Sequence, residues 1–137
     1  MPQSDQDHSY SSVTLTVADF ANLSLLEPCV PLQRVLERAR VVPSDAVPPQ
    51  VVTMNSHVVV IDENTGERRV LSVVYPGDAD ADAGRISVRE EGGAQLLGAT
   101  PGQTIECQLR SGVHRLRIEK IIYQPEDSMR TYLVVRS

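Results

Sequence analysis

The run from Ile86 to Gly98 restricts the fold most, because it joins the end of a strand to one short helix. Ile86 and Val88 are two residues apart, which is the spacing of a half-buried strand. Gly98 can adopt the left-handed conformation that ends a helix, and Pro101 prevents the helix from resuming. We therefore expect one short core helix that packs against a sheet.

The chain on both sides of this helix has the pattern of β-strands joined by tight turns. Asn64–Gly66 and Ser111–Gly112 are turn sequences that lie between apolar segments. The predicted strands are His57–Asp62, Val70–Tyr75, Arg85–Arg89, Thr104–Leu109 and Val113–Tyr123. Thr131–Val135 is compatible with a further edge strand, whose place the pattern does not fix. Strands in runs with one intervening helix predict an α+β fold with a mostly antiparallel, twisted sheet.

Two apolar stripes nearer the amino terminus predict a short helical hairpin over residues 13–42. The first helix, from Val17 to about Leu26, has apolar residues at helical spacing and ends before Pro28. The second helix begins near Pro31 and extends to about Arg40; its stripe is Leu32, Val35, Leu36 and Ala39. We expect the two helices to pack antiparallel and to project from the sheet domain. The alternating residues 13–17 are compatible with a brief extended lead-in.

Composition divides the rest of the chain. Residues 1–12 are rich in Ser, Gln and Asp, so we expect a disordered tail. Residues 43–50 contain Pro43, Pro48 and Pro49 and predict a semi-rigid linker. The main domain then covers residues 51–137.

The charge balance and the cysteines limit the classes of partner. A net charge of −5 argues against a general grip on nucleic acid, which needs an excess of Lys and Arg. Arg34, Arg38 and Arg40 are either a basic contact patch or a solvated helix face. No apolar run approaches the roughly 20 residues of a membrane span, and no signal peptide is apparent. We expect a cytoplasmic monomer with reduced thiols.

The titratable residues form no recognisable catalytic or metal-binding motif. Asp78, Asp80 and Asp82 resemble the start of a calcium-binding loop that lacks the required Gly and Glu. The three histidines have no metal-ligand spacing. Cys107 lies on an apolar strand face, where a buried and inert thiol is expected. We therefore expect no cofactor, no metal and no enzymatic activity.

The order of several short motifs resembles the carboxy-terminal domain of the bacterial Gre transcription elongation factors. The motifs are Val51–Val58, Thr65–Glu67, Ile86–Val88, Leu96–Gly98, Gly102, Ser111–Gly112 and Ile118–Ile122. Val51–Ser56 and Tyr123–Glu126 look closer still to the Gre-like group named regulators of nucleoside diphosphate kinase. The resemblance implies an FKBP-like domain that carries an amino-terminal antiparallel coiled coil. It also implies RNA polymerase as the partner.

The expected hairpin departs from the Gre pattern at its tip. The Gre factors that the chain resembles have a long coiled coil. Paired acidic residues at its tip help to hold a magnesium ion during transcript cleavage. Here the tip reads Glu27-Pro-Cys29-Val-Pro31, with one carboxylate, whereas a metal site normally takes at least two oxygen donors. The hairpin is also short. The resemblance therefore implies binding at the polymerase secondary channel without stimulation of cleavage.

The resemblance also indicates where the contact with the polymerase lies. Ser87, Arg89, Glu90, Glu91 and Gly92 match the family's docking segment, at the end of a strand. Gre factors have Ser-Pro where this chain has two glutamates, and these glutamates are alternatively solvated loop residues.

Two other classes of function stay open. FKBP-like folds include prolyl isomerases, whose pockets are lined by aromatic side chains, but this chain has one Phe and four Tyr without a cluster. The protein is alternatively an interaction module for another protein partner. The sequence does not indicate whether binding activates or represses transcription, whether a link to nucleoside diphosphate kinase is direct, or what residues 127–137 do.

Overall fold

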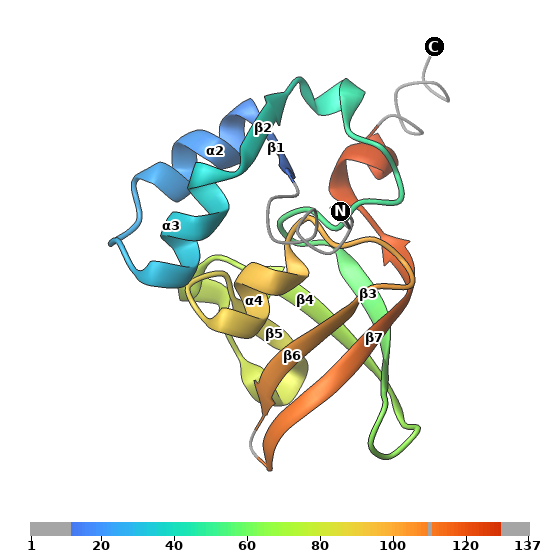
Figure 1. Cartoon of the computed structure of the whole chain (residues 1–137). Helices are drawn as coiled ribbons and strands as arrows, with labels where there is room; N and C mark the ends of the chain where they lie inside the picture. Colours follow the sequence, from blue (N-terminus) through green and yellow to red (C-terminus); the bar gives the residue numbers. More distant parts are fainter. Residues whose placement is uncertain (1–11, 110, 130–137) are drawn as a thin grey trace, which may run out of the picture.

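A computed structural model describes residues 12–109 and 111–129 and contains a five-stranded sheet in the order β5-β4-β3-β7-β6 (Figure 1). The strands are β3 (His57–Asp62), β4 (Arg68–Val74), β5 (Arg85–Ser87), β6 (Thr104–Leu109) and β7 (Gly112–Tyr123). Three of the neighbouring pairs are antiparallel, and β4 and β5 are parallel. The structure therefore confirms the α+β class and the mostly antiparallel sheet.

One short helix, α4 (Glu91–Leu96), packs on the sheet against β6 and β4 (Figure 1). Gly92 and Gly93 allow this close approach, because a β-carbon at Gly92 would lie 2.7 Å from the Cys107 sulfur. Gly98 follows with a φ of 86°, the left-handed conformation that the sequence predicts there. The run from Ile86 to Gly98 thus has the predicted strand, helix and helix end.

The amino-terminal region contains two strands as well as the two predicted helices. Its elements are β1 (Val13–Thr16), α2 (Val17–Ser24), α3 (Val30–Glu37) and β2 (Ala39–Val42). β1 and β2 pair in parallel, and the Val13 N–H donates a hydrogen bond to the Arg38 carbonyl at 2.9 Å. The extended lead-in is confirmed. The prediction that the second helix reaches Arg40 is wrong, because the chain pairs with β1 from Ala39 onward.

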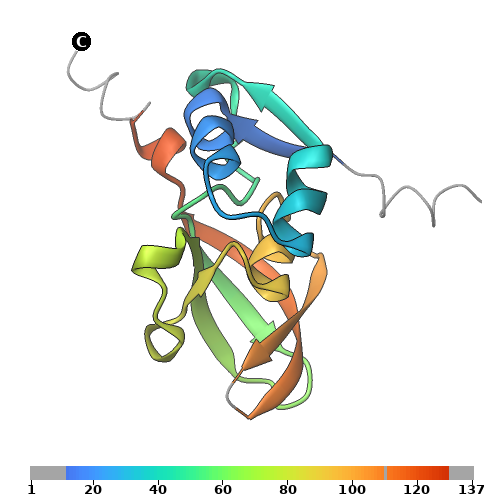
Figure 2. The same cartoon turned by 90° about the vertical axis from the view of Figure 1, so that its left-hand side faces the viewer.

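This region packs on the sheet domain, and the prediction of a projecting coiled coil is therefore wrong (Figure 2). Leu15, Leu23, Leu32 and Val35 are buried in the same hydrophobic core as Leu96 of α4. Each helix has only eight residues, or about 12 Å at 1.5 Å per residue. Helices of this length cannot bury their apolar stripes against each other alone, so α4 and the sheet domain cover them.

The segment after β2, residues 43–51, contacts the rest of the molecule through a buried side chain and hydrogen bonds. Residues 44–46 form a 3₁₀ turn, and Val47 is buried. The Gln124 side chain donates hydrogen bonds to the carbonyls of Pro48 and Val51 at 2.8 and 2.7 Å. The predicted tail, except Ser12, and the predicted edge strand Thr131–Val135 lie outside the described residues. Within the described ranges, no helix has the length and apolar character needed to cross a membrane.

Candidate functional site

Residues 87–92 make up the β5–α4 loop together with the last residue of β5 and the first two residues of α4, and they carry two exposed carboxylates. The Ser87 hydroxyl is buried and accepts a hydrogen bond from the Arg89 N–H at 3.1 Å, which holds the loop closed. Gly92 is also buried, whereas Arg89 is half-buried and Glu90 and Glu91 are exposed. Of the five residues that the sequence predicts for a contact, three are accessible and two shape the loop.

The tip of the amino-terminal helices lies directly against this loop. The Arg89 Nε donates a hydrogen bond to the Glu27 carbonyl at 3.1 Å, and the Cys29 thiol donates to the Arg89 carbonyl at 3.4 Å. The structure therefore joins the two groups of candidate residues that the sequence suggests separately. We call Glu27, Cys29, Arg89, Glu90 and Glu91 the tip–loop surface.

Arg34 of α3 adds a charge to this surface that the sequence leaves ambiguous. Its Nη1 lies 3.5 Å from the Glu91 carboxylate, and both side chains are more than half exposed. Exposed pairs of this kind contribute about 0–1 kcal/mol, so the pair orients Glu91 more than it stabilises the fold. No short-range pattern could reveal the pair, since the two residues are 57 positions apart.

The single carboxylate at the tip has no metal site around it. Among the residues that the structure describes, no three His, Cys, Asp or Glu side chains lie close enough together to hold a metal ion. The Glu27 side chain is exposed, and its backbone, not its carboxylate, bonds to the loop. The tip–loop surface thus has the chemistry of a charged contact surface.

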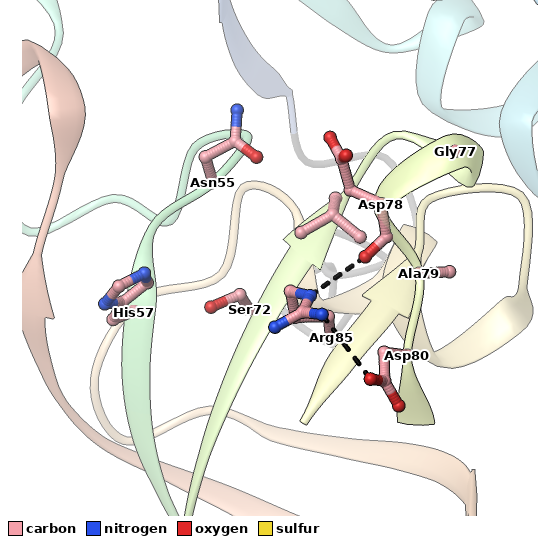
Figure 3. Close-up of a pocket in the computed structure, with 9 residues that line it drawn as sticks. Asn55, His57, Ser72, Gly77, Asp78, Ala79, Asp80 and Arg85 are labelled. Atoms are coloured by element: carbon pink, nitrogen blue, oxygen red, sulfur yellow. Dashed lines mark hydrogen bonds and ion pairs between the residues drawn. The ribbon is translucent and has the colours of Figure 1, made fainter. Parts of the chain in front are cut away.

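A separate hollow between β3, β4 and the loop before β5 is lined mainly by polar residues (Figure 3). Arg85 crosses it and donates to the Asp78 carbonyl at 2.9 Å, and its Nη2 lies 3.5 Å from the Asp80 carboxylate. Asp78 and Asp80 are two of the three residues that resemble a calcium loop. The Arg85 guanidinium already pairs with the Asp80 carboxylate and binds the Asp78 backbone carbonyl, so it would repel a second cation at these oxygens.

The described Phe and Tyr side chains come from different parts of the chain, and none of them lines this hollow. Phe20 lies on α2, and Tyr123 lies beside His57 at a ring distance of 5.1 Å. Tyr75 donates a hydrogen bond to Asp19 at 2.7 Å; burial and this bond raise the pKa of the Tyr75 phenol. The prolyl-isomerase alternative therefore gains no support from the described residues.

Comparison with known proteins relates the chain to bacterial transcription factors. A family model described as "Transcription elongation factor, GreA/GreB, C-term" matches residues 47–123. The "Regulator of nucleoside diphosphate kinase" of Escherichia coli K12 is 33% identical over 123 residues, which cover 89% of this chain and 88% of that protein. The elongation factor GreA of Azorhizobium caulinodans is 30% identical over 66% of this chain and 57% of its own. A solved structure titled "Prokaryotic transcription elongation factor GreA/GreB from Nitrosomonas europaea" has a TM-score of 0.68 and 33% identity, covering 82% of this chain and 98% of that one.

Proposed function

Because the chain belongs to the GreA/GreB family of transcription elongation factors, we propose that it is a transcription regulator that binds RNA polymerase at the secondary channel without stimulating transcript cleavage. Within this family, the chain is similar to the regulator of nucleoside diphosphate kinase. We also propose that residues 51–137 form an FKBP-like domain and that the protein is a cytoplasmic monomer.

The attachment of the tip to the loop is the observation that carries this proposal. A cleavage factor must bring carboxylates to the catalytic magnesium of the polymerase. A metal site normally takes at least two oxygen donors. Here the tip is bonded to Arg89 and presents Glu27 as its one carboxylate. A tip that stays on the domain cannot extend into the channel, whereas the exposed tip–loop surface is free to contact the rim.

The charges of this surface suit a transient contact. Glu27, Glu90 and Glu91 are exposed; Arg34 pairs with Glu91, and Arg89 donates to the Glu27 carbonyl. Charged residues at the rim of an interface mainly set the association rate and the salt dependence of binding. We propose that the carboxylates meet basic residues of the polymerase.

Two assays on one preparation test the proposal. In the first, labelled polymerase is titrated with the protein, and a Gre factor is added as competitor; we expect binding that the Gre factor displaces. In the second, the protein is added to backtracked elongation complexes, and we expect transcripts of unchanged length. Failure to bind, or binding that a Gre factor does not affect, would remove the docking proposal. Transcript shortening that Glu27→Ala abolishes would show that the tip does reach the catalytic ion.

A further inference from the structure

The β3–β4 and β6–β7 turns lie at the end of the sheet farthest from α2 and α3 (Figures 1 and 2). Three polar side chains at this end form a chain of hydrogen bonds. Ser111 lies in the β6–β7 turn, His114 lies on β7, and Asp62 is the last residue of β3. The Ser111 Oγ is 2.8 Å from His114 Nε2, and His114 Nδ1 is 2.5 Å from Asp62 Oδ2.

For a neutral His114, the chemistry of the three groups determines where the protons lie. An ionised carboxylate only accepts hydrogen bonds, so His114 Nδ1 must be the donor to Asp62. In the neutral imidazole, Nε2 is then the acceptor, and the Ser111 hydroxyl donates to it. This is the arrangement in which an imidazole can remove the proton from a serine hydroxyl.

Asp62 is built to keep this orientation. Its side chain is fully buried, its Oδ1 accepts a hydrogen bond from the Asn64 N–H at 2.9 Å, and Arg69 Nη2 lies 3.9 Å from Oδ2. Burial raises the pKa of Asp62, but the hydrogen bonds from His114 and Asn64 outweigh it and hold the pKa below its ordinary value. Asp62 thus stays ionised at neutral pH and holds the imidazole in one tautomer.

The nucleophile end of the line is open to the solvent. Ser111 is exposed, His114 is mostly buried, and Asp62 is fully buried, so accessibility increases from the carboxylate to the hydroxyl. A histidine that served only to neutralise Asp62 would need no partner at Nε2. We propose that Ser111 is a nucleophile that accepts acyl groups from activated esters, with His114 as its general base and Asp62 as the residue that positions the imidazole.

The reaction balances without a further reactant. Ser111 Oγ forms a bond to the acyl carbon, the bond from that carbon to the leaving oxygen breaks, and the serine proton passes through His114 Nε2 to the solvent. Water then attacks the acyl-serine, its proton passes to His114, and the carboxylic acid leaves as the serine oxygen regains a proton. This activity would be additional to polymerase binding and does not depend on it.

The full-length protein with p-nitrophenyl acetate provides the test. We expect release of p-nitrophenolate and an acetyl group on the peptide that contains Ser111, as identified by mass spectrometry. General bases contribute about 10²–10⁴-fold, so His114→Gln should slow acetylation of Ser111 by at least about a hundredfold. Ser111→Ala should abolish it, whereas Ser128→Ala, at another exposed serine, should react as the wild type does.

The role of Asp62 needs a measurement that a purely structural residue would not change. The proton on His114 Nδ1 should give a far-downfield proton resonance in the wild type and in Ser111→Ala, and none in Asp62→Asn. Melting curves will show which variants are folded. The proposal is overturned if acetylation occurs mainly at Cys29 or Lys120, if folded His114→Gln is acetylated at Ser111 as fast as the wild type, or if the resonance is absent from the wild type.

Discussion

Gly93 determines how closely α4 can approach the strand that leads into it. A β-carbon added at Gly93 would overlap the carbonyl group of Ser87, and the clashing atoms belong to the backbone, which cannot rotate away. Gly92 is restricted by Cys107, whose side-chain sulfur would lie 2.7 Å from an added β-carbon. These two glycines therefore set both the position of α4 and the shape of the loop that carries Glu90 and Glu91.

Gly93→Ala should lower the free energy of unfolding by about 1–3 kcal/mol, because overpacking a well-packed core forces backbone shifts of this cost. Gly77→Ala is a matched control, since a β-carbon added there would have no atom within 4 Å and the φ of Gly77 is ordinary. Urea titration of both variants measures the difference. Equal midpoints for Gly93→Ala and Gly77→Ala would show that α4 can move away from Ser87 at no cost.

Residue types were predictable from the sequence, but their partners were not. Ser87, Arg89, Glu90, Glu91 and Gly92 could be placed at a strand-to-helix junction from local spacing and a family resemblance. The bonds that join Arg89 to the tip depend on how the whole chain folds. The same holds for the bond between Asp62 and His114, which are 52 positions apart and share no motif.

At the scale of elements, the sheet, α4 and the extended segment that forms β1 followed from periodicity, whereas β2 and its pairing with β1 did not. Ala39 continues the helical apolar spacing of α3, so local pattern favours a longer helix. The parallel pairing of Val13 with Ala39 ends that helix early, and a partner 26 residues away leaves no local signal. The docked position of the helices likewise depends on the packing of their short apolar faces against α4.

The bonds between the tip and the loop should be individually weak. Arg89→Ala removes one exposed side-chain hydrogen bond, worth about 0.5–1 kcal/mol after its exposure is taken into account. We expect the tip to open more often and alkylation of Cys29 by iodoacetamide to become about two- to fivefold faster. Arg40→Ala, at an exposed position of β2, should leave the rate unchanged.

Cys107 provides an internal reference in the same experiment. It is buried, and burial raises the pKa of its thiol, so it should react slowly in every variant. An unchanged Cys29 rate in Arg89→Ala would mean that the Arg89 side chain does not hold the tip. Faster reaction of both thiols would instead indicate global loosening.

The whole molecule presents two chemically different ends. The tip–loop surface lies beside α3 and α4, and the Ser111–His114–Asp62 line lies at the turns of the opposite end of the sheet (Figure 1). One continuous hydrophobic core connects them. Because the two sites share no residue, substitutions at one end should leave the other end intact, and each proposal can fail alone.

Reversal of both loop carboxylates tests the charged contact with the polymerase. Glu90→Lys combined with Glu91→Lys should weaken polymerase binding at low salt, because the carboxylates would no longer face basic residues of the partner. The loss should shrink as salt rises, since the screening length falls from about 30 Å at 0.01 M to about 8 Å at 0.15 M. The fold should persist, because the only ion pair lost in the described structure is the exposed one with Arg34.

Glu37→Lys combined with Asp45→Lys is the control, as both residues are exposed and the net charge changes equally. If both double variants weaken binding to the same extent, net charge is responsible and the loop is not at the contact; if neither does, these carboxylates contribute nothing to it.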